Sequence, residues 1–350
     1  MQLKKVEHAP VRVGVVGCGV VAGYGHIPAI HAQEHAKLVA FADPDVSRRE
    51  TQATKYDLPG FPSFEEMADA VALDAVAIPT QPAIKLDMIR IAAARGLHAF
   101  CEKPLTDTVE QAEELVRLMD EAGLFVGMAF IYRGKPVVQR MMELLREGAI
   151  GRLRAVHIEN LWDYHGLRDA AVRGQRRRRA LKNLGTLDCG VHDLDMMRYM
   201  TGADYATISA DGIVVEDENE FPDHIVMHGR MTNGVLATIE ESAVWGHTAA
   251  ETPSYCQSYR MLGERGYLHA SAESYKHEAE LRVVSGEKQW TETRSSAKAW
   301  EQTYRQFFDM ILGRAVDHRF LAEGRDGLAN MKAAREVIAK CPDTAAALRT

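Results

Sequence analysis

A buried strand that runs directly into closely spaced glycines constrains the fold of this 350-residue chain most. The apolar segment Val11–Val16 is followed by Gly-x-Gly-x-x-Ala, which begins at Gly17 and is typical of a dinucleotide-binding turn. The first glycine permits the tight turn, the second lets a pyrophosphate approach, and the alanine lets a helix pack closely on the strand. The N-terminus of that helix faces the phosphate charge. The predicted cofactor contacts in this turn are Gly17, Gly19, Val20 and Val21.

A second apolar strand, Leu38–Ala42, follows at the spacing of a dinucleotide-binding unit and ends at Asp43. The Asp43 carboxylate can accept hydrogen bonds from the ribose hydroxyls of adenosine. It also repels the 2′-phosphate of NADP, so the sequence predicts NAD as the cofactor. NADP is the alternative, because Arg48 and Arg49 follow shortly. We expect both arginines on a helix that points them to solvent.

Strand and helix patterns alternate along the first part of the chain, as in a doubly wound α/β domain. Further strands are expected at Ala75–Ile78, Leu97–Cys101 and Leu124–Met128. Thr108 is expected to cap the helix before the last strand, with Gln111 as its capping-box partner. Ligands of open parallel sheets bind beyond the carboxyl ends of the strands. The residues near such ends that we expect in the cofactor site are Asp43, Thr80, Glu102 and Lys103.

The second half of the chain has a different pattern. Segments near residues 153–161 and 207–267 alternate or run β-branched without intervening helices, which predicts a mainly antiparallel sheet with one exposed face. The sequence thus predicts a Rossmann dinucleotide-binding domain over residues 1–130. An α+β domain with a large, mainly antiparallel sheet is predicted over residues 131–350, and we assign substrate binding and oligomerisation to it.

The composition fits two domains and argues against several classes of protein. Hydrophobic residues make up 46% of the chain, enough for two cores, and the net charge of -7 argues against a nucleic-acid partner despite the run Arg176–Arg179. No apolar run has membrane-spanning length and no signal peptide is recognised, so we expect a soluble, cytoplasmic protein without a membrane partner. The five cysteines have no paired spacing, so neither disulfides nor a metal site is expected.

Three ionisable residues further along have the spacing of an acid/base site. Asp188, His192 and Asp195 fall at i, i+4 and i+7, so a helix would place all three on one face, where carboxylates can orient an imidazole. The alternative is an amphipathic helix whose polar face is simply solvated. The apolar stripe beside these residues would consist of Leu187, Val191, Leu194 and Met197.

Four motifs, taken in order, resemble those of one known family. They are Gly17-x-Gly19-x-x-Ala22, Ala42-Asp43-Pro44-Asp45, Glu102-Lys103-Pro104 and Asp188-x-Gly190-x-His192-x-x-Asp195. Together they resemble the glucose-fructose oxidoreductase / inositol dehydrogenase family, often called Gfo/Idh/MocA, over nearly the whole chain. The resemblance implies a Rossmann domain followed by a domain whose large sheet commonly forms the interface of a homodimer or homotetramer. It also implies hydride transfer between a nicotinamide cofactor and a secondary alcohol of a sugar or cyclitol.

The resemblance further implies roles for single residues. Lys103 would hydrogen-bond the reacting hydroxyl, His192 would be the general acid/base, and Asp188 would orient His192 or the substrate. Elementary chemistry agrees, because an alcohol that loses hydride develops alkoxide character and needs a proton acceptor and a nearby cation. The alternative for Lys103 is an ordinary surface lysine before a proline.

Two positions depart from the family pattern. Lys85 stands where the family often has a histidine shortly after a Thr-Pro pair. Tyr132 and Arg133 stand where the family usually has two arginines. Both positions lie near the rim of the cofactor site in the family, so the sequence leaves the cofactor contacts there open.

The segment before the predicted catalytic helix is expected to line the substrate cavity, as it does in related enzymes. Aromatic faces suit the C–H faces of a sugar ring, whereas arginines suit a carboxylate or phosphate. A neutral sugar or inositol is the preferred substrate. An anionic sugar bound by Arg173 and the run Arg176–Arg179 is the alternative. The predicted substrate contacts, besides Lys103, Asp188 and His192, are Arg133, Trp162, Tyr164 and Arg168.

Two other functions remain open from the sequence. Some family members keep the cofactor bound and use transient oxidation to cleave or isomerise a glycoside, and a few relatives are nucleotide-binding sensors. Lys103, Asp188 and His192 argue against a sensor, since nucleotide binding alone does not need them. The sequence therefore favours an NAD-dependent dehydrogenase that acts on a sugar or cyclitol.

Overall fold

The structure is a computed structural model that describes residues 3–162, 190–214, 222–244, 255–273 and 277–341. Its contacts divide the chain into two units, one of residues 1–134 and 299–331 and one of residues 135–298 and 332–350. The sequence predicts one break, after residue 130. The chain also returns to the first unit at residue 299, because an aromatic helix there packs on the strand that contains Phe100.

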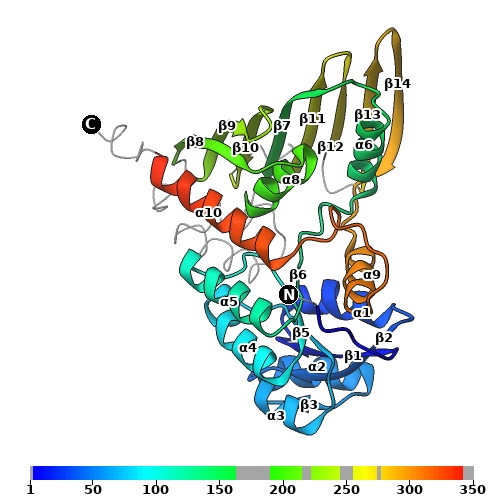
Figure 1. The fold of residues 1–350 in the computed structure, drawn as a ribbon, viewed down its shortest axis with the longest axis vertical. Coiled ribbons are helices and arrows are strands. Elements are labelled where there is room, and N and C mark those ends of the chain that lie inside the picture. Colours follow the sequence, from blue (N-terminus) through cyan, green and yellow to red (C-terminus); the bar gives the residue numbers. More distant parts are fainter. Residues whose placement is uncertain (1–2, 163–189, 215–221, 245–254, 274–276, 342–350) are drawn as a thin grey trace. The chain divides into compact units, whose positions relative to one another are not determined.

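The first unit contains six strands: β1 (Val11–Val16), β2 (Ala36–Ala42), β3 (Gly60–Phe61), β4 (Ala75–Ile78), β5 (His98–Cys101) and β6 (Val126–Met128). They form a parallel sheet of order β3-β2-β1-β4-β5-β6 (Figure 1). Every residue of β4 and β5 is buried, as expected of parallel strands that are covered on both faces. The predicted Rossmann sheet is confirmed.

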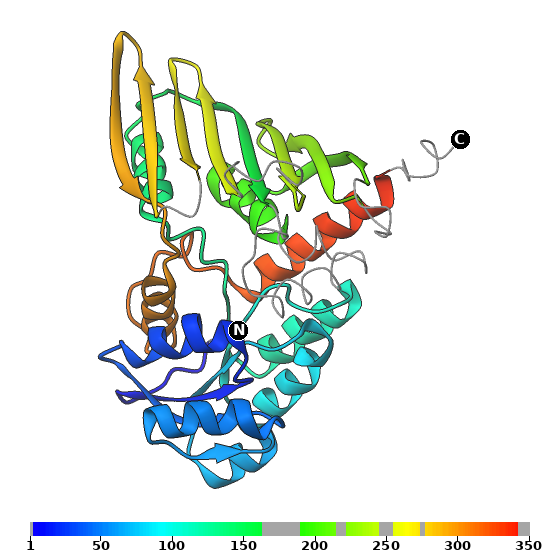
Figure 2. The ribbon, with the colours of Figure 1, turned by 180° about the vertical axis from the view of Figure 1, so that it is seen from behind.

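Helices cover the faces of this sheet. They are the π-helical η1 (Ala22–His26), α1 (Ile27–His31), α2 (Val46–Tyr56), α3 (Phe64–Ala70), α4 (Pro82–Arg95), α5 (Val109–Glu121) and α9 (Trp300–Ile311). Asp45, Ser63 and Thr108 accept hydrogen bonds from first-turn N–H groups of α2, α3 and α5, the last as predicted. In Figure 2, α1 lies next to α9, and α4 lies next to α5.

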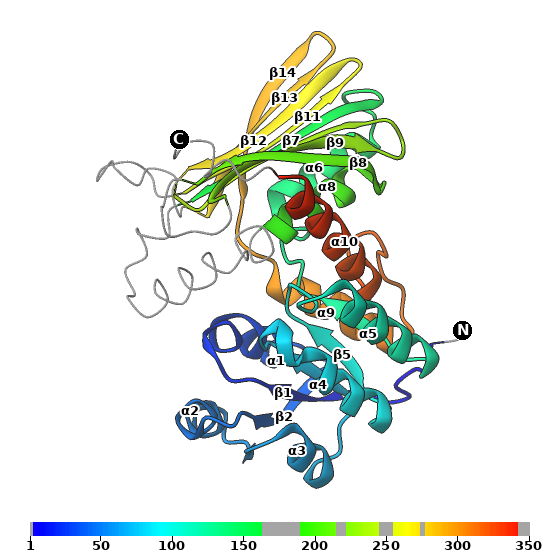
Figure 3. The ribbon, with the colours of Figure 1, turned by 90° about the vertical axis from the view of Figure 1, so that its left-hand side faces the viewer.

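The described residues of the second unit form eight strands: β7 (Leu153–Trp162), β8 (Tyr205–Ile213), β9 (His224–Met231), β10 (Leu236–Ser242), β11 (Tyr255–Gly263), β12 (Gly266–Glu273), β13 (Glu278–Ser285) and β14 (Lys288–Ser295). They form one sheet of order β14-β13-β12-β11-β7-β10-β9-β8, which is antiparallel except where β10 pairs with β7 (Figure 3). Buried residues alternate with more exposed ones along β13, so one face of the sheet is covered and the other is open. The predicted sheet is confirmed.

Over the described ranges the chain forms three further helices, α6 (Pro136–Arg146), α8 (Val191–Thr201) and α10 (Gly324–Lys340), and the boundary between the units falls within α10. Helix α8 packs on β7 and β10 and is buried at every position except Arg198. Val191, Leu194 and Met197 of the predicted apolar stripe are buried, and the polar residues beside them are buried as well, so the described part of this helix is buried all round. In the described part of the chain, no helix has both the length and the apolar character needed to cross a membrane.

Candidate dinucleotide site and catalytic elements

The turn after β1 has the backbone that a dinucleotide needs. Gly17 has a φ of +98°, and a Cβ there would lie 2.8 Å from the Cγ2 atom of Thr80, so only glycine fits. A Cβ at Gly19 would meet no atom within 4 Å, which leaves open space where the motif predicts a pyrophosphate. Val20 is exposed and Val21 is half-buried at the start of the following helical segment.

The Asp43 carboxylate, just after β2, is held by the backbone of the same turn. It accepts a hydrogen bond from the N–H of Cys18 at 2.7 Å and another from the N–H of Asp45 at 2.8 Å. Burial and the charge of Asp43 raise the pKa of the Cys18 thiol to about 12, so this thiol stays neutral at physiological pH. Asp43 thus lies beside the glycine turn, as the dinucleotide motif requires.

Arg48 and Arg49 follow Asp43 but differ in their contacts. Arg48 is exposed and pairs with Asp45 at 3.5 Å, in agreement with the prediction. The Arg49 side chain is only 12% exposed, and its guanidinium donates to the carbonyl oxygen of Asp43 at 2.8 Å. The expectation that both arginines point to solvent is therefore wrong for Arg49, because its alkyl chain packs over Gly60. A carboxylate and a guanidinium lie together after β2.

Thr80 lies near the carboxyl end of β4, beside Gly17. Its Oγ1 atom is buried and has no hydrogen-bond partner within the described ranges. An unsatisfied buried hydroxyl costs about 1 to 3 kcal/mol, so this atom fits a site in which a ligand supplies the partner. Together with the open space at Gly19 and the position of Asp43, this hydroxyl leaves room and a polar partner for a ligand at this edge of the sheet.

The Glu102–Pro104 loop follows β5 and is anchored by the Glu102 side chain. One oxygen of its carboxylate accepts a hydrogen bond from the N–H of Lys103 at 2.9 Å. The other accepts one from His26 Nε2 at 3.2 Å, and the Tyr304 hydroxyl donates to His26 Nδ1 at 2.6 Å when the ring is neutral. Burial raises the pKa of Glu102, but the His26 hydrogen bond and the charge of Lys103 outweigh it and hold the pKa below its usual value. Glu102 therefore anchors the loop as a carboxylate.

Lys85 of α4 contacts the same loop from inside the unit and is fully buried. Its Nζ atom donates to the carbonyl oxygens of Glu102 and Pro104, the two neighbours of Lys103. Burial lowers the pKa of Lys85 to about 8. The sequence singles out Lys85 as a departure near the cofactor rim but does not reveal this contact. Its spacing of four residues from the buried Ile89 is the signal for its burial.

His192 lies in the first turn of α8 in the second unit and is 7% exposed. Asp195, three residues later in the same helix, is 1% exposed, and this spacing places the two side chains on one face, as predicted. Their burial excludes the alternative of a solvated polar face for these two residues. Asp188, the third member of the predicted acid/base site, lies outside the described residues.

A buried polar cluster that the sequence analysis missed lies where α8 packs on the sheet. Asn160 of β7 donates to the Asp193 carboxylate at 2.7 Å, and Lys135 donates to the side-chain oxygen of Gln257 on β11. Asn160 and Gln257 stand opposite each other on paired strands. Burial and the charge of Lys298 lower the pKa of Lys135 to about 7, against the opposing effect of Asp193. Strand pairing brings Asn160 and Gln257 together, and the contacts of Asp193 and Lys135 with them span more than 30 residues, so no local pattern reveals the cluster.

The remaining predicted substrate contacts have different environments. Arg133 is buried in the first unit, where its guanidinium lies 3.3 Å from the Asp326 carboxylate and donates to the carbonyl oxygen of Arg319 at 3.1 Å. Trp162, the last residue of β7, packs against Ala243 in the second unit. The other residues named for substrate binding lie outside the described residues: Tyr164, Arg168, Arg173 and Arg176–Arg179.

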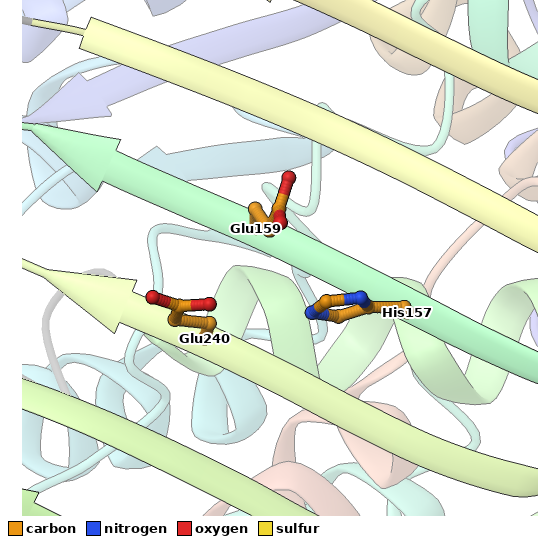
Figure 4. A group of neighbouring side chains, drawn as sticks. All are labelled: His157, Glu159 and Glu240. Carbon is orange, nitrogen blue, oxygen red and sulfur yellow. The ribbon is translucent and has the colours of Figure 1, made fainter.

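Three side chains of metal-ligand type meet on the open face of the second sheet (Figure 4). They are His157 and Glu159 of β7 and Glu240 of β10. One ring nitrogen of the histidine and one carboxylate oxygen of each glutamate lie within 4.8 Å of one another. Glu159 already has a cationic neighbour, since Arg260 donates to it at 2.9 Å, and His224 Nε2 lies 3.6 Å from a carboxylate oxygen of Glu240. We therefore assign this cluster to ion pairing across the sheet.

Comparison with known families matches the two halves of the chain in turn. The family model described as "Oxidoreductase family, NAD-binding Rossmann fold" matches residues 11–130. The model described as "GFO/IDH/MocA C-terminal domain" matches residues 138–269. The chain belongs to the Gfo/Idh/MocA family of oxidoreductases, and the resemblance inferred from the four motifs is confirmed.

Two relatives are similar to this chain over part of their length. D-xylose 1-dehydrogenase (NADP(+)) 2 of Haloferax volcanii is 35% identical over 133 residues, which are 38% of this chain and 41% of the relative. scyllo-Inositol 2-dehydrogenase (NAD(+)) of Bacillus subtilis is 29% identical over 216 residues, which are 61% of this chain and 60% of the relative. One name specifies NADP and the other NAD, so these relatives leave the cofactor choice open.

A solved structure is similar over nearly the whole chain. It is an oxidoreductase from Agrobacterium radiobacter in complex with NAD+, L-tartaric acid and magnesium. The two superpose with a TM-score of 0.81 and 17% identity, over 97% of this chain and 99% of the other. At this level of identity the likeness shows the fold alone.

Proposed function

We propose that this protein is an NAD-dependent dehydrogenase that oxidises a secondary hydroxyl of a sugar or cyclitol. The position of Lys103 carries the proposal. This lysine follows β5, at the sheet edge that also contains the glycine turn and Thr80. Open parallel sheets bind their ligands at that edge. Similarity to dehydrogenases named for xylose and scyllo-inositol supports the substrate class.

In this proposal the chain's own side chains handle the proton of the reacting hydroxyl. Lys103 donates a hydrogen bond to the reacting oxygen and stabilises the negative charge that develops there as the C–H bond breaks. His192 accepts the hydroxyl proton as a general base, and Asp188 orients His192 or the substrate. A bound nicotinamide supplies the hydride acceptor.

We assign the cofactor to the carboxyl edge of the first sheet and propose NAD over NADP. The Asp43 carboxylate fits the ribose hydroxyls and repels a 2′-phosphate. The nearby Arg49 would favour the 2′-phosphate of NADP, but its guanidinium already donates a hydrogen bond to the carbonyl oxygen of Asp43. The residues proposed to hold the cofactor are Gly17, Gly19, Val20, Val21, Asp43, Thr80, Glu102 and Lys103.

For the substrate we propose a neutral sugar or cyclitol contacted by Lys103 and His192. Trp162 is suited to the C–H face of a ring. Tyr164 and Arg168 complete the proposed contacts. Arg133 is a weaker candidate, because its guanidinium is engaged by Asp326 and Arg319.

We further propose that the chain forms a homodimer or homotetramer through the open face of the second sheet. Leu236 and Leu262 on this face are each about half exposed, and both lie opposite Ala155 of β7. Exposed apolar groups that adjoin in this way are typical of association surfaces. Light scattering should give a dimer or tetramer mass for the wild type and a monomer mass for Leu236→Glu combined with Leu262→Glu. A monomeric wild type contradicts this proposal.

A substrate screen tests the proposed activity. Purified protein is mixed with NAD+ or NADP+ and with a panel of free sugars, inositols, glycosides and sugar phosphates, and reduced cofactor is followed by absorbance. We expect reduction of NAD+ with at least one neutral sugar or cyclitol. Cleavage of a glycoside without net reduced cofactor would replace the dehydrogenase by redox-assisted cleavage. Tight cofactor binding without turnover of any compound would replace it by a sensor.

A further inference from the structure

Lys85 is a fully buried lysine that contacts the loop carrying Lys103. It lies on the face of α4 that also buries Ile89. Its Nζ atom donates hydrogen bonds to the carbonyl oxygens of Glu102 and Pro104. These two residues flank Lys103 in the sequence, so one amine holds the backbone on both sides of it.

The two carbonyl groups explain why a lysine is found at this position. Strand β5 ends at Cys101, so the carbonyls of Glu102 and Pro104 lie beyond the named strand and are bound by other donors. Burying an ammonium group is costly, and an apolar side chain would fill the same helix face without that cost. Hydrogen bonds from a charged donor are stronger than those between neutral groups, which offsets the cost of burying Lys85.

We propose that Lys85 is a positioning residue for hydride transfer: it fixes the backbone of the Glu102–Pro104 loop and thereby sets where the Lys103 amine meets the reacting hydroxyl. The inference rests on the proposed function, because it takes Lys103 as the residue that contacts the substrate. Lys85 itself acts only through the loop, by holding its carbonyl oxygens.

A second anchor of the loop is separate from Lys85. The Glu102 carboxylate accepts the N–H of Lys103 at 2.9 Å and is held in turn by His26. This anchor holds the amide side of Lys103, whereas Lys85 holds the carbonyl oxygens before and after it. A substitution of Lys85 therefore loosens the loop without removing the Glu102 contact.

The surroundings of Lys85 make its hold on the loop depend on pH. Burial lowers its pKa to about 8; the charges of Glu102 and Asp107 oppose this shift, and the charge of Lys103 adds to it. The Cys101 thiol stays neutral in this range, because burial raises its pKa to about 12. Above about pH 8 Lys85 loses its charge and its hydrogen bonds to the carbonyls weaken. Turnover should therefore decline on the alkaline side.

The test compares Lys85→Met, which keeps the length of the side chain but not its donors, with Ile89→Ala, which removes packing from the same helix face. Near neutral pH, Lys85→Met should lower kcat by about tenfold or more, because small misplacements of a catalytic group are costly, while both KM values change by less than about threefold. The alkaline decline of wild-type kcat should be absent from Lys85→Met. Ile89→Ala should lower stability and keep both kcat and the decline.

A second readout needs no turnover. In the cofactor-free protein, hydrogen exchange of backbone amides over residues 102–106 should be about tenfold faster in Lys85→Met than in the wild type, because local opening controls exchange. Ile89→Ala should not single out this loop. Wild-type kcat and unchanged exchange in Lys85→Met would overturn the proposal, as would an equal loss of kcat in Ile89→Ala.

Two further variants keep the outcome unambiguous. If Lys85→Met does not fold, Lys85→Arg replaces it, since its charge persists at every assay pH. Lys85→Arg should protect the loop and abolish the alkaline decline, and a decline like that of the wild type would overturn the proposal. Lys103→Ala separates the two claims. An inactive Lys103→Ala beside a fully active Lys85→Met refutes only the positioning role, whereas a fully active Lys103→Ala refutes the proposed function itself.

Discussion

Each of the two elements to which we assign the chemistry has a buried lysine near it, and the two lysines differ in what they bind. Lys85 donates to backbone carbonyls of the loop that carries Lys103. Lys135 donates to the side-chain oxygen of Gln257, in the polar cluster beside the helix that carries His192. Every residue has a backbone carbonyl, so the acceptors of Lys85 do not depend on residue type. The acceptor of Lys135 exists only because residue 257 is a glutamine. Backbone hydrogen bonds therefore hold the loop, whereas hydrogen bonds between side chains hold the cluster beside α8. We expect substitutions in that cluster to be a place where substrate preference can vary.

The largest effects should come from the proposed catalytic side chains of both regions, however each is braced. Lys103→Ala and His192→Ala should each lower kcat by at least about a hundredfold, the usual scale for losing an acid/base group. Cofactor affinity, measured by titration calorimetry, should change by less than about threefold. Lys288→Ala, on exposed β14, serves as the control and should keep kcat. Wild-type turnover by His192→Ala would show that another residue is the base.

The next effect tests whether the side-chain cluster stabilises the second unit. Asn160→Ala removes a donor from the buried Asp193 carboxylate and should lower the free energy of unfolding by about 2 kcal/mol. The control is Gln139→Ala, which removes a part-buried hydrogen bond to the Tyr199 hydroxyl and should cost about 1 kcal/mol or less. Urea titrations measure both values. Equal losses of stability would mean that the hydrogen bond to the buried Asp193 carboxylate contributes no more than the part-buried hydrogen bond to Tyr199.

Cofactor choice tests the first unit alone. Wild-type protein should bind NAD at least about tenfold more tightly than NADP, a difference of about 1.4 kcal/mol. Asp43→Ser should reduce or reverse that preference, because it removes the carboxylate and leaves Arg49 in place. Asp45→Ser is the matched control, since serine can still cap α2. Equal or tighter binding of NADP by the wild type contradicts the assignment.

The smallest expected effect is the pH dependence of stability that Lys135 introduces. Its pKa is about 7 in the folded protein, below the ordinary value of about 10.4 expected after unfolding. Between these values the unfolded chain binds more protons, so the contribution of Lys135 to stability rises with pH. We therefore compare the free energy of unfolding of Lys135→Met with that of the wild type at two pH values. The difference, variant minus wild type, should be larger at about pH 7 than at about pH 9 by on the order of 1 kcal/mol.

Lys288→Met is the control for that measurement, because Lys288 is exposed. Urea unfolding at both pH values gives the comparison, and the lost contact to Gln257 cancels because it affects Lys135→Met at each pH. Parallel stability curves for the wild type and Lys135→Met would show that Lys135 keeps its charge when buried.

The first unit was predictable because its signals are local. The glycine turn, the strand Val11–Val16 and the cap Thr108 depend on neighbouring residues, and the sequence predicts each of them where the structure has it. The contact of Lys85 with the carbonyl oxygen of Glu102 spans 17 residues, so no local pattern predicts it, although the spacing of Lys85 from Ile89 indicates that Lys85 is buried.

The second unit was predictable only in outline. The alternation of apolar and polar residues predicts the sheet and its exposed face. The contact of Lys135 with Gln257, however, spans 122 residues and depends on which strands pair. Contacts between residues far apart in the sequence also explain why the described part of α8 is buried all round. Asp193 is satisfied by Asn160 of β7, a partner 33 residues away that no helix pattern reveals.

Deuterium transfer tests the central claim most directly. The best substrate of the screen is prepared with deuterium on the carbon that bears the reacting hydroxyl and is turned over with NAD+. Mass spectrometry of the cofactor and the sugar product should then find the deuterium on the reduced nicotinamide and a carbonyl at the labelled carbon. Turnover that leaves the deuterium on the sugar, or releases it to water, would contradict hydride transfer to the cofactor.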